Sequence, residues 1–297
     1  MLIIASINPE RILTVMAKFE LSAFTDEYSQ DFAKQIEGMK KHGIKYTEIR
    51  GINGKNVSEI TIDEAKEVNK MLDAEGLAVW SVGSPLGKIK LTDDIGKHID
   101  LTKHVCEIAN VLGTERIRVF SFYVPDTSNV APYKAQVFDW MGRMLEASTP
   151  YGAILCHENE KGIYGEKVEG CLDIFNTFGD GYRCIFDPAN FVQADVKTYP
   201  DAFSALGSHI YYMHIKDALT DKSIAPAGKG IGMIPEILRE LDKRDETIVL
   251  TIEPHLRVFS GLYKLEAEGN TTEIVNRYAT SEEAFAAAVS ALRSIIE

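Results

Sequence analysis

The sequence predicts an α/β fold, a single (β/α)8 barrel of the TIM type. Strand-like and helix-like segments alternate strictly along the chain, and the alternation repeats eight times. Strict alternation indicates a parallel sheet, and eight units are the number that closes such a sheet into a barrel. The length of 297 residues also suits one barrel. A doubly wound open sheet is the main competing architecture.

Each expected strand is a short run of apolar or β-prone residues that ends in polar or turn-forming residues. The weak alternation of apolar and polar positions is typical of strands covered on both faces. In chain order the expected strands are Phe19–Phe24, Lys45–Arg50, Leu77–Val82, Arg116–Phe122, Ala153–Glu158, Cys184–Asp187, Tyr211–His214 and Ile248–Glu253.

Apolar residues recur at helical spacing after each of the first four strands. Gly43, Gly76 and Gly113 follow the first three of these stripes, as expected for glycines that end helices. The four segments are Phe32, Ile36 and Met39; about Asp63 to Ala74; Ile95, Val105, Ile108 and Leu112; and Val137, Trp140, Met144 and Leu145.

Helical spacing also follows the last four strands, with a shorter helix in the sixth unit and a long loop before the seventh. The expected helical segments are Val168, Cys171, Leu172 and Phe175; about Pro200 to Leu206; Pro235, Ile237, Leu238 and Leu241; and Glu282–Ile296. No linker or low-complexity segment interrupts the series, so we expect residues 1–297 to form one domain.

The first residues of the chain carry no targeting signal that we can identify. Met1 to Ser6 are too few and lack the basic lead of a signal peptide. Met16, directly before the first strand, offers a second initiation point, which would make residues 1–17 an N-terminal appendage. No apolar stretch approaches the roughly 20 residues of a membrane span.

Composition and charge narrow the class of partner. Apolar residues make up 45% of the chain and charged residues 26%, as in soluble globular proteins. The net charge of -12, from 44 acidic against 32 basic residues, argues against extensive contact with nucleic acid or an anionic membrane. We therefore expect no nucleic-acid partner and no membrane partner.

The four cysteines form no CxxC pair. Three of them lie in apolar periodic segments, and Cys156 and Cys184 fall inside expected strands. This favours buried, reduced thiols in a cytoplasmic protein over disulfides. They are Cys106, Cys156, Cys171 and Cys184.

Each of the last four strands ends in a residue that can bind a metal: Glu158, Asp187, His214 and Glu253. Taken singly, each residue suits a helix cap, a turn or a buried hydrogen-bonded histidine. Strand ends of a parallel barrel converge, however, and four such groups would repel one another unless a cation neutralised them. The sequence therefore predicts one divalent metal ion at the active site of an enzyme.

Three carboxylates and one imidazole form an oxygen-rich ligand set. This set suits manganese, magnesium, cobalt or a catalytic zinc, and Mn²⁺ is the preferred candidate. Structural zinc sites are built from Cys and His at spacings that are absent from this chain.

Several motifs at or near the ends of the strands carry a resemblance to a known family. They are Phe24-Thr25-Asp26-Glu27, Tyr46–Gly51, Ser84–Ile89, His157–Gly165, Phe186–Asn190, Met213–Asp217 and Ile252–His255. From about Lys18 to the C-terminus, the chain resembles the xylose isomerase-like TIM barrels of the sugar-phosphate isomerase and epimerase group. That group includes ketose 3-epimerases, hydroxypyruvate isomerase and inosose dehydratase.

The resemblance implies that Glu158, Asp187, His214 and Glu253 are the metal ligands. It further implies an isomerase or epimerase of a sugar, sugar phosphate or related keto compound. In such enzymes Glu158 and Glu253 would be catalytic, one removing a proton next to a carbonyl and the other returning it. A dehydratase of a keto-inositol or similar compound begins with the same step and is the alternative.

One position departs from the resemblance. Epimerases of free ketoses usually have a histidine three residues after the aspartate, and this chain has Asn190 there. Asparagine binds hydroxyl groups but does not shuttle protons near neutral pH. We therefore expect Asn190 to be a substrate-binding residue and the substrate to depend on it.

Three further residues are expected to bind substrate. Lys216 should face the same side of its strand as His214, where its ammonium group can steady an oxyanion or pair with a barrel carboxylate. Glu48 ends the second strand together with Arg50, and both contact either substrate hydroxyls or neighbouring side chains. Lys88, in a Ser-Pro-Leu-Gly-Lys loop, either meets a phosphate or carboxylate or is simply exposed.

Two loops are candidates for functional segments. Pro226–Gly232 has the composition of a phosphate-binding loop but lacks the lysine and threonine ending of a nucleotide-binding motif. The loop from His255 to about Tyr278 is long enough to be a lid, with Phe259 and Tyr263 as residues that cover a sugar or a second subunit.

The other function classes have specific counter-evidence. An abasic-site endonuclease shares the barrel but needs additional histidine ligands and a basic surface, and this chain has seven histidines in all. A non-catalytic binding protein would not need the complete ligand quartet. We expect a small-molecule substrate, with a homodimer as the possible assembly.

Overall fold

Eight parallel strands close into a barrel in the computed structural model, which describes residues 18–258 and 278–297. Around the barrel the strand order is β1-β12-β9-β8-β7-β6-β5-β2, and β1 and β12 pair in register over six residues. The strands are β1 (Lys18–Ala23), β2 (Tyr46–Ile49), β5 (Ala78–Val82), β6 (Arg116–Val119), β7 (Ile154–Glu158), β8 (Tyr182–Phe186), β9 (Ile210–Ile215) and β12 (Thr247–Ile252).

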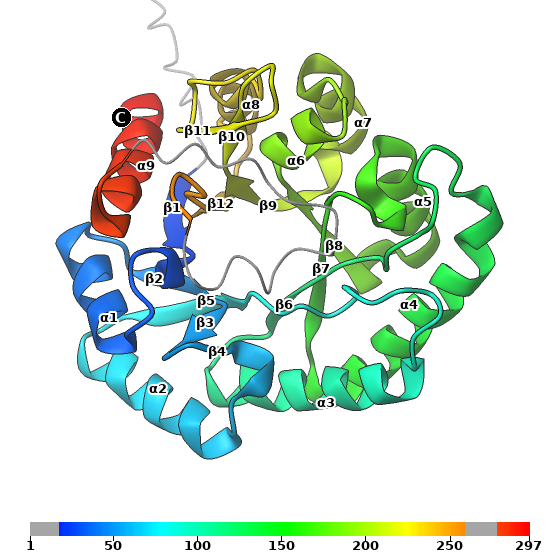
Figure 1. The fold of residues 1–297 in the computed structure, drawn as a ribbon, viewed down its shortest axis with the longest axis horizontal. Helices are drawn as coiled ribbons and strands as arrows, with labels where there is room; N and C mark the ends of the chain where they lie inside the picture. The colour runs from blue at the N-terminus through cyan, green and yellow to red at the C-terminus, as the bar shows by residue number, and fades with distance from the viewer. Residues whose placement is uncertain (1–17, 259–277) are drawn as a thin grey trace, which may run out of the picture.

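Helices cover the outside of the barrel (Figure 1). Their apolar stripes face the strands, and one continuous core of buried residues lies between the two layers. The helices are α1 (Phe32–Lys41), α2 (Ile62–Ala74), α3 (Ile95–Val111), α4 (Lys134–Ser148), α5 (Val168–Phe178), α6 (Pro188–Gln193), α7 (Phe203–Leu206), α8 (Ile234–Leu241) and α9 (Ser281–Ile296). The predicted TIM barrel is confirmed.

Most expected strands differ from the observed ones by one or two residues at an end, and three differences are larger. Strand β6 ends at Val119 rather than Phe122, because Phe120 and Phe122 donate their N–H groups to the loop that contains Leu86 and Gly87. Helix α6 is not among the predicted helices, since six residues starting with proline resemble a turn in sequence. Before α7, Thr198–Ala202 forms a single irregular turn instead of part of the helix expected from Pro200.

Two short antiparallel ribbons lie outside the barrel sheet. They are β3–β4 (Gly51–Ile52 with Lys55–Asn56) and β10–β11 (Asp217–Ala218 with Ile224–Ala225). Each begins shortly after a barrel strand, β2 or β9, so both ribbons project from the carboxyl ends of strands (Figure 1).

Alternation along the strands separates an inner core from the site residues. Cys156, Ile185 and Tyr212 stand two positions before Glu158, Asp187 and His214 and belong, with Val249, to a second buried apolar cluster. Because side chains two apart point to the same side of a strand, this cluster lies inside the barrel beneath the four candidate ligands. The site therefore has an apolar floor.

All four cysteines are buried and carry free thiols, as predicted. Within the described ranges no helix combines the length and apolar character needed to cross a membrane. Phe259, Tyr263 and most of the expected lid lie outside the described residues, as do residues 1–17.

Candidate metal centre

The four predicted ligands lie together at the carboxyl ends of four neighbouring strands. Glu158 is the last residue of β7, Asp187 and Glu253 directly follow β8 and β12, and His214 lies near the end of β9. One ligand atom from each residue lies within 4.8 Å of those of the other three, and all four side chains are buried. The four side chains therefore converge, as expected for residues at the strand ends of a closed barrel.

The charges of the cluster perturb one another strongly. Burial, assisted by Glu158 and Glu253 and opposed by Lys216, raises the pKa of Asp187 to about 7. Burial opposes the charged form of Glu158, but His214 and Arg118 bring its pKa down to about 2. The carboxylates therefore depend on nearby positive charge to remain ionised.

The donor set fits a divalent cation. Three buried carboxylates and one imidazole suit hard and borderline metals. Oδ2 of Asp187 accepts no hydrogen bond among the described residues, although it lies 3.2 Å from Lys216 Nζ. A buried carboxylate oxygen that accepts no hydrogen bond has lone pairs with which to bind a cation. The cluster is therefore a candidate site for one divalent metal ion.

His214 is oriented by a second carboxylate. Its Nδ1 lies 2.9 Å from Glu158 Oε1, and its Nε2 lies 3.1 Å from Glu48 Oε2. Burial opposes a charge on this ring, but Glu158 and Glu48 raise its pKa to about 10. Nδ1 thus faces the cluster while Glu48 holds the far side of the ring, an arrangement common for metal-binding histidines.

Glu48 is predicted to contact substrate, and the structure places it behind His214. Its side chain is buried, and its Oε1 accepts a hydrogen bond from the Tyr212 hydroxyl at 3.1 Å. Both carboxylate oxygens therefore already contact side chains of β9. The sequence leaves open whether Glu48 contacts substrate or neighbouring side chains, and the observed contacts are to neighbours.

Asn190 lies on the first turn of α6, where Asp187 caps the helix by accepting its N–H at 3.0 Å. The side-chain amide donates to Glu158 Oε1 at 3.1 Å and to the carbonyl of Asn159 at 2.9 Å. The residue that departs from the ketose epimerases thus directly orients one of the two predicted catalytic carboxylates.

Lys216 extends into the same cluster. Its Nζ lies 2.8 Å from Glu253 Oε2 and 3.2 Å from Asp187 Oδ2. Burial opposes its charge, but the Asp187 and Glu253 carboxylates raise its pKa well above the ordinary value. Of the two interpretations that the sequence leaves open, pairing with barrel carboxylates is the contact observed.

Lys88 is largely buried rather than an exposed loop lysine. Its Nζ lies 3.0 Å from Glu160 Oε2 and 4.4 Å from the centre of the Phe120 ring. Gly87 places this loop. Its φ is +89°, and a Cβ added at this position would lie 2.0 Å from the Phe120 carbonyl oxygen, so there is room for glycine alone.

The glycine-containing segment Pro226–Gly232 encloses a carboxylate of the chain itself. The backbone N–H groups of Gly228 and Gly230 donate to Oδ2 of Asp217, and that of Gly232 donates to Oδ1. Three N–H groups of a loop with phosphate-binding composition are thus satisfied by Asp217, and those of Lys229 and Ile231 donate to backbone carbonyls. Their function in this structure is to fix the rim of the site next to Lys216.

Two buried arginines lie near the cluster, and one of them, Arg118, is not among the residues singled out from the sequence. Arg50 Nη1 lies 2.9 Å from Glu253 Oε1, and Arg118 Nη1 lies 3.3 Å from Glu158 Oε2. A signal existed for Arg118, because a charged residue inside an otherwise buried strand needs a partner. Its partner is on the next strand, which the sequence alone does not show.

His157 points away from the cluster, as predicted from its alternation with Glu158. Its ring packs against Phe175 of α5, and its Nε2 lies 2.9 Å from the Ser121 hydroxyl.

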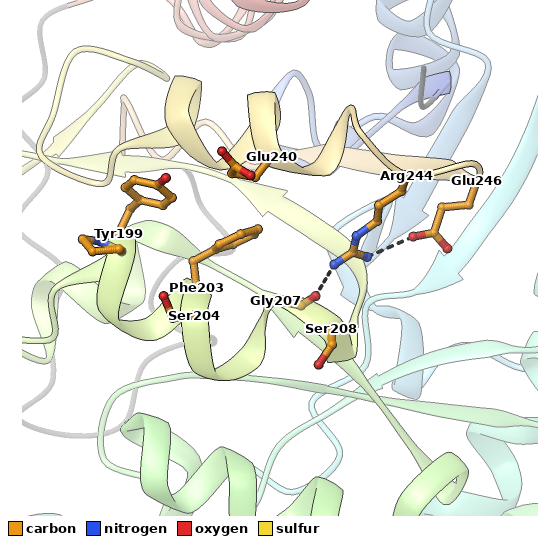
Figure 2. A pocket seen from close by; sticks show the side chains of 9 residues that line it. Tyr199, Phe203, Ser204, Gly207, Ser208, Glu240, Arg244 and Glu246 are labelled. Atoms are coloured by element: carbon orange, nitrogen blue, oxygen red, sulfur yellow. Dashed lines mark hydrogen bonds and ion pairs between the residues drawn. The ribbon is translucent and has the colours of Figure 1, made fainter. Parts of the chain in front are cut away.

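A separate cavity of about 670 Å³ lies at the other end of the barrel. It is lined by residues that precede β9 and β12, including Gly207, Ser208 and Glu246, and by the aromatic rings of Tyr199 and Phe203. Figure 2 shows Arg244 crossing it to the Gly207 carbonyl and the Glu246 carboxylate. None of the predicted site residues lines this cavity.

Comparison with solved structures gives the same fold at low sequence identity. A probable 3-DHS dehydratase, AsbF, from Bacillus anthracis is 14% identical, with a TM-score of 0.70 over 93% of this chain and 98% of that one. The IOLI protein with a bound zinc atom is 18% identical, with a TM-score of 0.69 over 93% and 98%.

A D-allulose 3-epimerase from Methylomonas sp., solved in complex with D-allulose, is 15% identical. Its TM-score is 0.66 over 95% of this chain and 99% of that one. Comparison with curated protein sequences found no match. The family model described as xylose isomerase-like TIM barrel matches residues 36–294, and the chain therefore belongs to the xylose isomerase-like TIM barrel family.

Proposed function

We propose that this protein is a divalent-metal-dependent isomerase or epimerase of a sugar, a sugar phosphate or a related keto compound. The observation that carries the proposal is the placement of two buried glutamates. Glu158 and Glu253 come from strands three apart around the barrel, yet both lie within 4.8 Å of Asp187 and His214 ligand atoms. Two carboxylates that flank one centre can act on opposite sides of a bound substrate.

The reaction is proton transfer at the carbon next to a carbonyl. One glutamate takes the proton, the electron pair of the C–H bond moves into the adjacent C–C bond, and the carbonyl oxygen gains negative charge. The other glutamate, protonated at that stage, returns a proton to carbon. A divalent ion held by Glu158, Asp187, His214 and Glu253, with Mn²⁺ as first choice, would stabilise the negative charge on the substrate oxygens.

The remaining residues hold these groups in place. Lys216 bridges Asp187 and Glu253, and its ammonium group can donate to a substrate oxygen from there. Asn190 donates to Glu158 and leaves proton transfer to the two glutamates, because an amide does not titrate near neutral pH. We keep Asn190, Lys216, Glu48 and Lys88 as proposed substrate-binding residues, directly or through the groups that they contact.

A lyase is the alternative within the same site. A dehydratase begins with the same proton abstraction and then loses a hydroxyl group from the next carbon. The similarity in fold to a probable 3-DHS dehydratase favours testing this reaction in parallel. The product distinguishes the two: an isomer or epimer keeps the mass of the substrate, whereas dehydration removes one water.

The test is hydrogen exchange in D₂O with Mn²⁺-loaded protein and a panel of ketoses, sugar phosphates, hydroxypyruvate and inosose. We expect the wild type to incorporate deuterium next to the carbonyl of at least one compound. Glu253→Gln should abolish this incorporation while the variant stays folded.

Glu37→Gln, an exposed change of the same kind on α1, is the matched control and should exchange as the wild type does. Full exchange in Glu253→Gln would remove that residue from proton transfer. A wild type that binds no Mn²⁺, Co²⁺ or Zn²⁺ would overturn the proposed function.

A further inference from the structure

Each of the two proposed acid–base glutamates has its own buried arginine. Arg50, directly after β2, contacts Glu253, and Arg118, on β6, contacts Glu158. Their side chains are 2% and 4% exposed, so neither guanidinium group is a surface charge. The two arginines are held in different ways, and this difference suggests two distinct tasks.

Arg50 is fixed by carboxylates on its other edges. Its Nε and Nη2 donate to Oδ2 and Oδ1 of Asp26 at 2.9 and 3.0 Å, a two-pronged contact that fixes the plane of the group. Nη2 also donates to Glu27 at 3.0 Å. Nη1 then donates to Glu253 Oε1 at 2.9 Å, so the position of this oxygen follows from the plane that Asp26 sets.

Glu27 also fixes the chain immediately after Glu253. It accepts the backbone N–H of His255 at 2.6 Å, and its Oε1 lies 2.9 Å from the His255 ring nitrogen Nδ1. The turn that follows β1 therefore holds Glu253 from two directions, through Arg50 and through the backbone of His255. All of these contacts are buried.

Arg118 has a simpler environment. Its Nη2 donates to the backbone carbonyls of Gly83 and Ser84 at 3.2 and 3.5 Å. Among the described residues, Glu158 is the carboxylate within ion-pair distance, at 3.3 Å, and Nε of Arg118 has no hydrogen-bond partner. Carbonyls do not neutralise a charge, so the positive charge of Arg118 acts mainly on Glu158.

The ring of Phe24 lies against both guanidinium groups. The Cζ atoms of Arg50 and Arg118 lie 4.3 and 5.0 Å from its centre, and the His214 ring meets it edge-on at 5.1 Å. A Cβ added at Gly83 would lie 2.7 Å from this ring, so Gly83 leaves space for it. One aromatic side chain thus contacts both arginines and the ring of His214.

We propose that Arg50 is a positioning residue that places Glu253 by its fixed geometry, whereas Arg118 serves Glu158 as a dedicated counter-ion. The proposal rests on the proposed function and refines it. The charge of Arg50 is divided among three carboxylates, so it adds little net charge at Glu253, and the direction of Nη1 is what matters. Arg118 acts through its positive charge, whose effect depends less on the direction of its N–H groups.

Lysine substitution separates these roles, because lysine keeps the charge but lacks the planar group with its fixed donors. The first measurement is the affinity for Mn²⁺ alone, determined by electron paramagnetic resonance of the unbound ion. We expect Arg50→Lys to weaken Mn²⁺ binding by about 10- to 100-fold, the usual range for residues that orient metal ligands. Arg118→Lys should weaken it by less than about tenfold.

Exchange in D₂O with a reactive compound from the panel is the second readout. We expect Arg118→Met to lower kcat and Arg118→Lys to restore most of the loss. Arg50→Met and Arg50→Lys should be equally impaired. Asp26→Asn should lower the exchange rate as Arg50→Lys does, although Asp26 does not touch Glu253. The reason is that the asparagine has only one of the two oxygens that accept from Arg50.

Arg143→Lys, an exposed change on α4, is the control, and thermal unfolding checks that each variant is folded. Equal rescue by lysine at both positions would overturn the distinction, as would equal failure at both. A wild type that binds Mn²⁺ but exchanges no compound contradicts the proposed function and leaves the Mn²⁺ affinities to decide the roles of the arginines. If Arg50→Lys is destabilised, Asp26→Asn takes its place in the test. Unchanged Mn²⁺ affinity in Asp26→Asn would then contradict the proposal.

Discussion

Asp217 is the residue that decides the shape of the loop beside Lys216. It accepts four backbone N–H groups, from Ala218 and from three glycines of the following segment. Cβ atoms added at Gly230 and Gly232 would lie 2.4 and 2.6 Å from its Oδ1, so glycine is required for this approach. The Asp217 carboxylate therefore takes the place in this loop of the phosphate that the loop composition suggests.

Asp217→Asn should destabilise the protein. The amide nitrogen would face N–H donors in place of an oxygen, leaving two buried N–H groups without an acceptor at roughly 1–3 kcal/mol each. We expect a loss of at least about 2 kcal/mol in unfolding free energy, measured by urea denaturation. A change within about 0.5 kcal/mol, the range of an ordinary surface substitution, would contradict this account.

His98 links helix α3 to the loop that carries Lys88. Its Nε2 accepts the N–H of Gly87 at 2.8 Å, which requires the neutral ring. Burial lowers the pKa of His98 to about 4, against 6.5 for the unperturbed group. The unfolded chain therefore takes up a proton before the folded chain does, and stability falls as the pH drops from about 6.5 towards 4.

His98→Gln should remove this part of the pH dependence, since glutamine can accept the same N–H without titrating. Between pH 7 and pH 5 we expect the wild type to lose about 2 kcal/mol more unfolding free energy than the variant. Denaturant unfolding at the two pH values measures the difference. Parallel losses in both proteins would show that His98 does not titrate in this window.

At the scale of elements, local signals placed most helices. The helix α2 begins at Thr61, whose hydroxyl accepts the N–H of Glu64 while the Glu64 carboxylate accepts the N–H of Thr61. Helix α6 shows the opposite case. It has six residues, and its N-cap Asp187 is also a candidate metal ligand, so the sequence Asp-Pro resembles a turn. Only the packing of this segment in the folded protein distinguishes a short helix from a turn.

Thr61→Ala tests the reciprocal cap. The change leaves the N–H of Glu64 without its side-chain acceptor, and we expect a loss of about 1 kcal/mol in unfolding free energy. Thr61→Ser keeps the hydroxyl and is the matched control. Thr61 is exposed and Glu64 is half-buried, and neither is close in sequence to the four candidate ligands. The Mn²⁺ affinity of the two variants should therefore equal that of the wild type. Equal stability of the alanine and serine variants would argue against the cap.

At the scale of the molecule, the candidate metal centre joins half of the barrel. Its four residues come from β7, β8, β9 and β12, which are neighbours in the closed sheet. The sheet is completed where β12 pairs with β1, the last barrel strand in the chain with the first. A cation bound at the ends of these strands would stabilise contacts between segments almost 100 residues apart in the sequence.

Metal removal and addition test this link. Protein treated with a chelator should gain about 2.7 kcal/mol of unfolding free energy when Mn²⁺ is added to 100 times its dissociation constant. Calorimetry or denaturant unfolding with and without Mn²⁺ measures the gain. The double variant Asp187→Asn and Glu253→Gln should gain nothing under the same conditions. Equal gains in both proteins would place the bound ion elsewhere.

The sequence by itself determined the barrel and the four candidate ligands. Both rest on patterns local to each strand: an apolar run, then a residue that can bind a metal, repeated in a series whose closure brings the strand ends together. The predicted set Glu158, Asp187, His214 and Glu253 indeed lies within 4.8 Å in the structure. The roles of these residues remain proposals.

Only the tertiary structure decided which partners these residues have. Arg50 meets Glu253 across 203 positions of sequence, and His214 meets Glu48 across 166. Such pairs depend on strand register and on the direction of each side chain, and neither quantity is encoded in a local pattern. The same reason explains the enclosed Asp217 and the buried Lys88, whose surroundings come from distant segments that meet when the barrel closes.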